Sequence, residues 1–377
     1  MKTKTLLFVL LIIPITVTAQ IDSILSKLSF TGDFRFRVEQ DWDSRKSDGS
    51  FRDDRTRLRY RIRLGAQYKD KWYKTGFRLR TGNPIKQQDP QLTLGDGSKE
   101  FGTLPIGFEK AYFHGDWDNF GFGLGKTDFP FEKSNELFWS GNVFPEGVFL
   151  WKNFLSNTKS IDKLSLQAGH FIIASAGTSF QKDAYMQGYQ TYISILKKRF
   201  EFFPSLYLFR NIANIPDGGG SYTIDYSITH LGTRYRLLKQ SSLQLELDYY
   251  YNLQDYSKDN AIAEDLKEQK TGMALGLSYG QLQKKGDCFF KASYAKIEQY
   301  AVVDVMAQND WARWDYSTFG SPDGRLSNFQ GIELVASIKL DKKTSLTMKY
   351  YWVEQLVAYG EMLETGSRIR FDLDIKL

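Results

Sequence analysis

The sequence predicts an all-β protein, a transmembrane antiparallel β-barrel of about 16 strands, with roughly 14 to 18 as the range. Three observations predict it: strands with one apolar and one charged face, connections that alternate between short and long, and an N-terminal segment typical of export. The clearest strand carries arginine at every second position from Arg55 to Arg63, with mainly apolar residues between them. Because side chains alternate across a strand, the apolar face would contact lipid and the arginines would line a watery lumen.

Residues 1–19 have the layout of a secretory signal peptide. Two lysines precede an apolar run over residues 6–17, and Val17-Thr18-Ala19 forms a small-residue cleavage site. The run contains Pro14 and is shorter than the ~20 residues that a helix needs to cross a bilayer. We therefore expect cleavage after Ala19. Residues 20–377 would form a single outer-membrane barrel domain, because no Pro-rich or Ser/Gly-rich linker divides them.

Sixteen segments alternate apolar with polar or small residues over about ten positions, the length that a tilted strand needs to cross a membrane. They span residues 29–42, 52–68, 72–82, 107–117, 120–127, 147–156, 164–175, 185–197, 200–212, 223–238, 242–255, 269–283, 287–300, 327–340, 344–358 and 366–377. The connections alternate between short ones, such as 118–119, and long ones, such as 128–146. This pattern predicts short periplasmic turns at one end and long extracellular loops at the other. A soluble two-sheet sandwich has no reason to sort its loops in this way.

Composition narrows the classes of function. Aromatic residues make up 15% of the chain, with 22 Tyr and 28 Phe, as expected where aromatic girdles stand at two membrane interfaces. The formal charge of +6 becomes +4 when the two lysines of the signal are removed, which gives no argument for a nucleic-acid partner. Cys288 is the single cysteine and excludes an internal disulfide. No zinc-type spacing, phosphate loop or dinucleotide motif is present, so no cofactor is expected.

The predicted lumen has two candidate functional elements. Arginines on the first three strands are expected to line one wall of the pore: Arg35, Arg37, Arg55, Arg57, Arg59, Arg61, Arg63, Arg78 and Arg80. The loop at 128–146 is rich in Phe, Pro and Trp and would expose a large apolar patch in solvent, so we expect it to fold inward as a constriction. Its candidate residues are Asp128, Glu132, Glu136, Trp139 and Glu146. A lid packed on neighbouring loops at the barrel mouth is the alternative.

Two roles are open for the arginines. Facing the acids of the inward loop, they would create a transverse field across a narrow pore and a mild preference for anions or for polar solutes with carboxylate or phosphate groups. Alternatively, they would pair with nearby acids and stiffen the wall, since opposite charges across strands stabilise a sheet. The acids in reach are Asp33, Glu39, Asp41, Asp372 and Asp374.

The segment from Gly125 to Leu150 resembles a family of porins of Gram-negative outer membranes. The shared elements are Pro130-Phe131, Trp139, Asn142 and Pro145-Glu146-Gly147. This resemblance implies a porin-like barrel in the outer membrane and passive diffusion, without a settled substrate. Trimers are usual for barrels of this size among porins, so a homotrimer is an expected assembly, although the sequence shows no interface.

The predicted function is a porin: a water-filled channel for passive diffusion of small polar or anionic solutes, and not an enzyme. One alternative is a barrel that acts as an adhesin or scaffold through its long loops. Another is an outer-membrane hydrolase, for which His114, His170 and His230 would be the candidate bases. None of these histidines stands in a recognisable arrangement with a nucleophile and an orienting acid.

Overall fold

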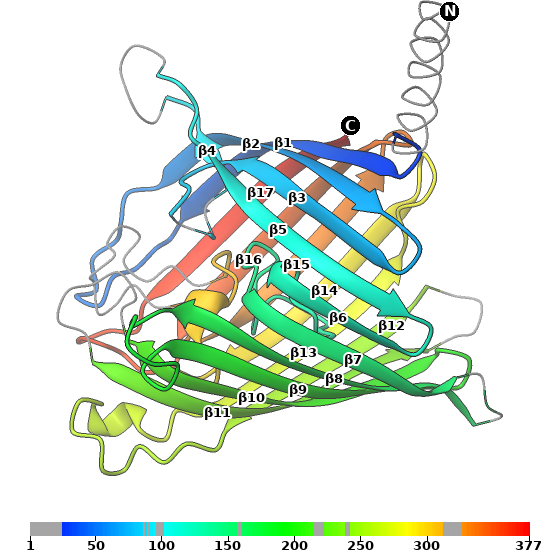
Figure 1. The fold of residues 1–377 in the computed structure, drawn as a ribbon. Helices are drawn as coiled ribbons and strands as arrows, with labels where there is room; N and C mark the ends of the chain where they lie inside the picture. Colours follow the sequence, from blue (N-terminus) through cyan, green and yellow to red (C-terminus); the bar gives the residue numbers. More distant parts are fainter. Residues whose placement is uncertain are drawn as a thin grey trace, which may run out of the picture.

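The chain folds into a closed barrel of sixteen antiparallel strands (Figure 1). The computed structural model describes residues 25–85, 87–88, 90–95, 102–156, 158, 160–214, 222–237, 242–311 and 326–377. The expected signal peptide, residues 1–19, lies outside this described part. Within it, no helix has the length and apolarity needed to cross a bilayer. The predicted all-β antiparallel barrel is confirmed, including its strand number.

Seventeen strands carry labels because a two-residue strand, β4, lies in the connection between β3 and β5. Their bounds are β1 Leu28–Trp42, β2 Arg55–Lys69, β3 Tyr73–Thr81, β4 Leu92–Thr93, β5 Ile106–Trp117, β6 Phe120–Lys126, β7 Glu146–Ser156, β8 Ile161–Ala174, β9 Ala184–Ile195, β10 Phe200–Ala213, β11 Thr223–Arg236, β12 Gln244–Asn252, β13 Thr271–Gly280, β14 Cys288–Ile297, β15 Phe329–Lys339, β16 Thr344–Gln355 and β17 Thr365–Lys376. Two 3-10 turns, η1 Glu264–Leu266 and η2 Asp304–Met306, lie in loops.

Neighbouring strands in the chain pair in sequence order, and β1 closes the barrel by pairing with both β2 and β17. In the β1–β17 pairing, which we term the closing seam, the register runs from Asp33 opposite Lys376 to Asp41 opposite Arg368. The exception to simple order is β4, which pairs with β2 at Tyr60 beyond the end of the shorter β3.

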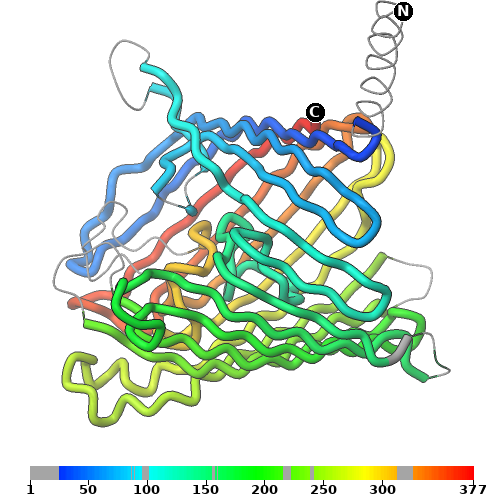
Figure 2. The backbone as a smooth tube through the Cα atoms, viewed as in Figure 1, coloured from blue at the N-terminus to red at the C-terminus, as the bar shows by residue number. Residues whose placement is uncertain are grey.

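Connections of two to seven residues alternate with connections of nine residues or more. The short turns gather at one end of the barrel and the long loops at the other, as the course of the backbone tube shows (Figure 2). Strand boundaries differ from the predicted ones by a few residues. No strand end shifts by more than three residues. One such end is that of β12 at Asn252, where the buried Asn252 side chain accepts the Ser227 and Gln254 N–H groups, at 3.0 and 3.1 Å, and thereby ends the strand ladder.

The outer face of the barrel is apolar. Leu58, Phe77, Leu150, Leu247 and Phe371 are exposed at 37% to 49% on five different strands, while their sequence neighbours point inward. Aromatic residues gather near the short turns. The rings of Trp72 and Trp117 stack at 5.3 Å there. This face therefore has the polarity of a surface that contacts lipid.

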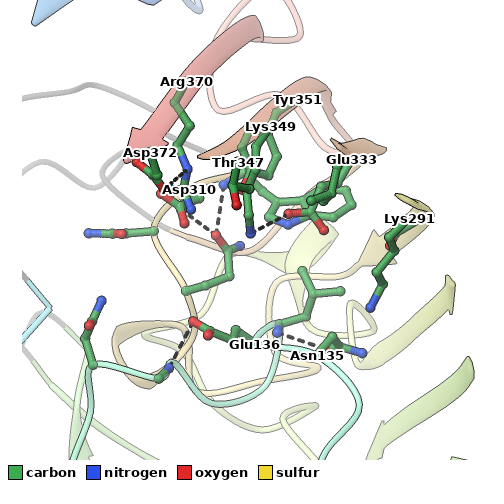
Figure 3. Close-up of a pocket in the computed structure, with 18 of the residues that line it drawn as sticks. Asn135, Glu136, Lys291, Asp310, Glu333, Thr347, Lys349, Tyr351, Arg370 and Asp372 are labelled. Carbon is green, nitrogen blue, oxygen red and sulfur yellow. Dashed lines mark hydrogen bonds and ion pairs between the residues drawn. The ribbon is translucent and has the colours of Figure 1, made fainter. Parts of the chain in front are cut away.

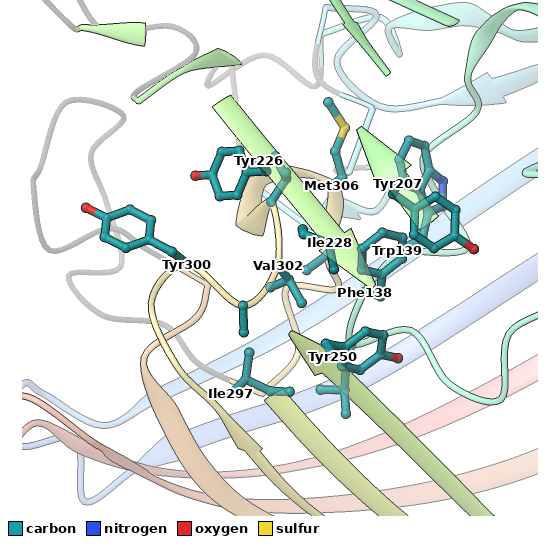
Figure 4. Close-up of a cluster of buried hydrophobic side chains, with 14 of the residues drawn as sticks. Phe138, Trp139, Tyr207, Tyr226, Ile228, Tyr250, Ile297, Tyr300, Val302 and Met306 are labelled. Atoms are coloured by element: carbon teal, nitrogen blue, oxygen red, sulfur yellow. The ribbon is translucent and has the colours of Figure 1, made fainter. Parts of the chain in front are cut away.

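The buried apolar core lies inside the barrel and against one side of its wall. Phe138 and Trp139, from the β6–β7 connection, pack with Tyr207, Ile228 and Tyr250 of β10, β11 and β12 (Figure 4). A closed barrel of this size encloses more space than its wall side chains fill, and loop residues occupy part of it. The remaining space forms a polar cavity.

Candidate pore constriction

A polar cavity of about 620 Å³ lies in the lumen (Figure 3). Its wall is a continuous run of neighbouring strands, from β12 through β17 to β1 and β2. Residues 134–137, 141 and 142 of the β6–β7 connection narrow it from within. Among the described lining residues, eight basic and seven acidic side chains are present, so the lining carries almost no net formal charge.

The predicted arginine wall points into the lumen but only partly reaches the cavity. Five of the nine arginines line it: Arg35, Arg37, Arg59, Arg61 and Arg63. The other four are not among its lining residues: Arg55, Arg57, Arg78 and Arg80. Arg78 instead lies over the Phe144 ring, 5.1 Å from its centroid. The alternation along a strand therefore does not indicate the depth at which each side chain lies.

Every one of these arginines has a carboxylate partner on the wall. The pairs are Arg35–Asp374 (2.7 Å), Arg37–Asp372 (2.5 Å), Arg55–Asp41 (3.0 Å), Arg57–Glu39, Arg59–Glu39 (3.6 Å), Arg61–Asp33 (2.7 Å), Arg63–Asp33 (2.8 Å), Arg78–Glu109 (2.5 Å) and Arg80–Glu109 (4.0 Å). The acids are those expected from the sequence, with Glu109 in addition.

Pairing does not remove the positive character of the wall. In the β1–β2 register, Arg35 stands directly opposite Arg61, and Arg37 stands opposite Arg59. Like charges in such positions are destabilising by themselves. The carboxylates of β17 offset this repulsion, and the four guanidinium groups remain together at the edge of the cavity.

The β6–β7 connection, residues 127–145, folds into the lumen, and its apolar side chains attach it to the inner wall. Trp139 is 2% exposed, stacks on Phe129 at 4.4 Å and donates its indole N–H to the Val143 carbonyl at 2.9 Å. Phe131 packs against the wall where Gly188 leaves room, since a Cβ at that position would stand 2.4 Å from the ring. The loop is thus held by a hydrophobic cluster that it shares with the barrel wall.

Polar contacts fix the loop at three further points. Glu132 binds Arg234 at 2.5 Å, and its backbone N–H donates to the Gln190 side chain at 2.7 Å. At the tip, Asn135 donates to the buried Asp248 at 2.7 Å. Burial lowers the pKa of Lys133, partly offset by Glu136, and the Lys133 ammonium donates to the Trp139 carbonyl at 2.6 Å.

The four predicted acids of this loop have different positions. Glu136 alone lines the cavity, where its carboxylate accepts the Gly141 N–H at 3.0 Å. Glu132 pairs with the wall, and Asp128 pairs with Lys110 at 2.8 Å, so neither reaches the lining. Glu146 is not a loop residue. It is the first residue of β7, and it stands exposed on the outward face of that strand with Lys126 as its partner.

Several lining residues are not predicted from the sequence. Strands β12 to β16 contribute the ion pairs Glu246–Lys291 at 2.6 Å and Glu333–Lys349 at 3.2 Å. A second inward loop contributes Asp310, which forms an ion pair with Arg370. The run of Ala, Val and Met residues in 301–307 is an apolar signal like that of 128–146, and it could have predicted this second loop.

The three histidines make separate contacts. His114 lies 2.9 Å from the Thr127 hydroxyl, and His230 lies 2.7 Å from Asp248 inside the aromatic core. His170 contacts Gln187 at 3.3 Å. In the described part of the chain, no group of three or more His, Cys, Asp or Glu residues could hold a metal ion.

No protein-family model matches the chain, and no curated protein matches it. Solved structures do. OprB of Pseudomonas putida, in its high-pH structure, aligns with a TM-score of 0.57 at 12% identity over 94% of this chain and 96% of that chain. A variant of Rh. blastica porin aligns with a TM-score of 0.50 at 12% identity, over 92% of this chain and 100% of that chain. At this identity the likeness is one of fold, so the chain has a porin-like barrel fold.

Proposed function

We propose that this protein is an outer-membrane porin, a channel for passive diffusion of small polar or anionic solutes. One observation carries the proposal: the barrel is apolar outside and charged inside, and a polar cavity remains between its wall and the inward loop. A soluble barrel would bury apolar residues and expose charges. The porin-like fold of OprB and Rh. blastica porin supports the same function.

Selectivity would come from the width and charge of the constriction. The arginines at the edge of the cavity include Arg59 and Arg61, and Glu136 faces the cavity from the loop. Charges interact more strongly in a narrow, partly dehydrated passage than in bulk water. Because the lining acids nearly balance the basic residues, the expected anion preference is modest.

We further propose that the protein lies in the outer membrane, in contact with lipid and with copies of itself. Residues 1–19 would direct export and be removed, and the apolar outer face would contact outer-membrane lipid. A homotrimer remains the proposed assembly. Chemical crosslinking of the purified protein in mild detergent, read by mass, tests it separately from conduction.

Single-channel recording in a planar bilayer tests the channel directly. Purified protein that lacks residues 1–19 should give steady open channels, and a salt gradient should give a reversal potential on the anion side. Replacing Arg59 and Arg61 together by Gln should shift that potential toward the cation side. Arg236→Gln, at the exposed end of β11, is the matched control and should leave it unchanged.

Absence of conductance from a correctly folded barrel would refute the channel. The long loops at one end would then favour an adhesin or scaffold, which binds through its surface without conducting. Open channels whose reversal potential is the same with and without the two arginines would retain the porin and assign those side chains to stiffening the wall.

A further inference from the structure

The connection between β14 and β15 begins with a buried segment, residues 298–311, that enters the lumen. Val302 is fully buried, Ala307 is 1% exposed and Trp311 is 6% exposed. Val302 and Met306 lie in the same cluster as Phe138 and Trp139 of the β6–β7 connection (Figure 4). A loop standing in solvent at the barrel mouth would not be buried to this extent. The segment therefore belongs to the filling of the pore.

Two backbone hydrogen bonds join this segment to the loop at 127–145. Ser140 N–H donates to the Met306 carbonyl at 2.7 Å, and Gln308 N–H donates to the Glu136 carbonyl at 3.0 Å. The second bond fixes the backbone of the residue whose carboxylate faces the cavity. Since both bonds are between main-chain groups, a movement of one segment must break them or carry the other segment with it.

The β3–β5 connection holds the same segment from another side. The Gln88 side chain donates to the Val305 carbonyl at 2.8 Å and also to the Ala307 carbonyl. Its neighbour Gln87 accepts the Phe144 N–H at 2.9 Å. Three connections of the barrel therefore meet inside the lumen.

Asp310 attaches the segment to the arginine wall. Its carboxylate pairs with Arg370 (Figure 3). Its backbone carbonyl accepts a hydrogen bond from Arg368 at 3.1 Å. Burial alone would raise the pKa of Asp310, but Arg370, Arg37, Lys349 and Arg368 outweigh it and hold the pKa well below its usual value. Next to it, the Trp311 ring lies 5.8 Å from the ring of Tyr351.

The segment also forms part of the cavity surface. Gln308, Asn309, Asp310 and Trp311 all line the cavity, beside residues 134–137 of the other loop. The cavity is thus bounded by the wall and by both loops, with Gln88, Pro90 and Gln91 of the β3–β5 connection beside them.

We infer that residues 298–311 form a second constriction element, which sets the width of the pore and positions the loop at 127–145, with Asp310 as the residue that fixes it to the wall. The inference rests on the proposed channel function. The substitution Asp310→Ala removes the carboxylate partner of Arg370, so the segment should move from the wall and widen the passage. Single-channel conductance should rise roughly twofold, because conduction follows the cross-section of the narrowest part.

A matched control replaces an acid in another acid–arginine pair. Asp225, 3.8 Å from Arg210 on the outer side of β11, is not among the residues lining the cavity, and Asp225→Ala should leave the conductance unchanged. Far-UV circular dichroism and the migration of unheated protein in SDS gels show whether each variant has the barrel. These two measurements distinguish a wider pore from a misfolded barrel.

A reversible crosslink tests positioning within one molecule. In a Cys288→Ser background, Ser140→Cys and Met306→Cys place two thiols at the point where the two segments share a backbone hydrogen bond. Added to Asp310→Ala, the disulfide should return the conductance to the parent value, and a reducing agent should raise it again. A variant that merely weakens the barrel would not respond to reduction.

The outcomes separate the inference from the proposed function. If the parent protein gives no channel, the proposed function fails first. If the parent conducts, and the folded Asp310→Ala variant conducts equally with and without the crosslink, residues 298–311 do not set the width and the inference is wrong. The inference is supported if the conductance rises with Asp310→Ala and not with Asp225→Ala, and if the crosslink reverses the rise.

Discussion

Replacing Trp139 by Ala should release the loop at 127–145 without unfolding the barrel. The side chain is 2% exposed, it stacks on Phe129, and its indole N–H satisfies the Val143 carbonyl. Removing a buried Trp costs about 3–5 kcal/mol. Within that cost, the ring pair accounts for about 0.5–1.5 kcal/mol and the unsatisfied carbonyl for about 1–3 kcal/mol. The cost falls on the loop, because Trp139 belongs to no strand ladder.

The open population of the loop should therefore rise by roughly two to four orders of magnitude, at about 1.4 kcal/mol for each factor of ten. Trypsin reports this opening, because Lys133 lies in the loop and its ammonium is bound to the Trp139 carbonyl in the closed state. Cleavage after Lys133, followed by mass spectrometry, follows the open population when reclosing is fast. Trp117→Ala is the control, because Trp117 ends β5 beside the short turn at 118–119 and stacks on Trp72, outside the loop. Cleavage of the folded Trp139→Ala variant at the parent rate would refute the reasoning.

Three further predictions concern other parts of the barrel. Gly188→Ala should displace the Phe131 ring, costing about 1–3 kcal/mol and increasing loop cleavage by trypsin, whereas unchanged cleavage would contradict the close contact. Leu247→Arg, on the outward face of β12, should destabilise the barrel by about 2–4 kcal/mol in urea titrations in lipid vesicles if this face contacts the bilayer midplane. Because the depressed pKa of Asp310 keeps it ionised, its contribution persists above about pH 4 and is lost only at lower pH. Conductance should therefore be equal at pH 7 and pH 4.5, and a rise at pH 4.5 that is absent in Asp310→Asn would argue against this.

The strands could be predicted from the sequence because each one must place apolar residues outside and polar residues inside. That requirement acts at every second residue, so it leaves a period-two pattern even in weakly apolar strands such as β17. The ends of strands follow less closely, because contacts such as those of Asn252 depend on residues far away in the chain.

The positions of side chains inside the lumen could be predicted less well than the strands. Alternation assigns Arg55 and Arg61 to the same face, but it contains no information about which of them lies at the level of the cavity. The positions of Glu132 and Glu136 likewise depend on the path of a loop without periodicity. The β4 pairing with β2 was not predicted either, because its two residues are too few to show a pattern.

The two ladders of β1 differ in how their partner strands are connected. β2 follows β1 in the chain, so the connection at 43–54 keeps the two strands adjacent, and arginines stand opposite arginines there. No loop joins β1 to β17. There, Asp33, Arg35, Arg37, Glu39 and Asp41 each face an opposite charge: Lys376, Asp374, Asp372, Arg370 and Arg368.

If the register of the closing seam shifted by two residues, the apolar residues would still face outward. The hydrophobic contribution to stability would therefore hardly change. Electrostatic repulsion would disfavour the shifted register. A shift in one direction sets Arg37 opposite Arg370 and Asp33 opposite Asp374, and a shift in the other sets Glu39 opposite Asp372. The order of charges on β1 and β17 thus selects the register in which these two strands pair. The final step of barrel assembly should accordingly depend on ionic strength, with more misregistered, heat-labile barrels when refolding takes place in high salt.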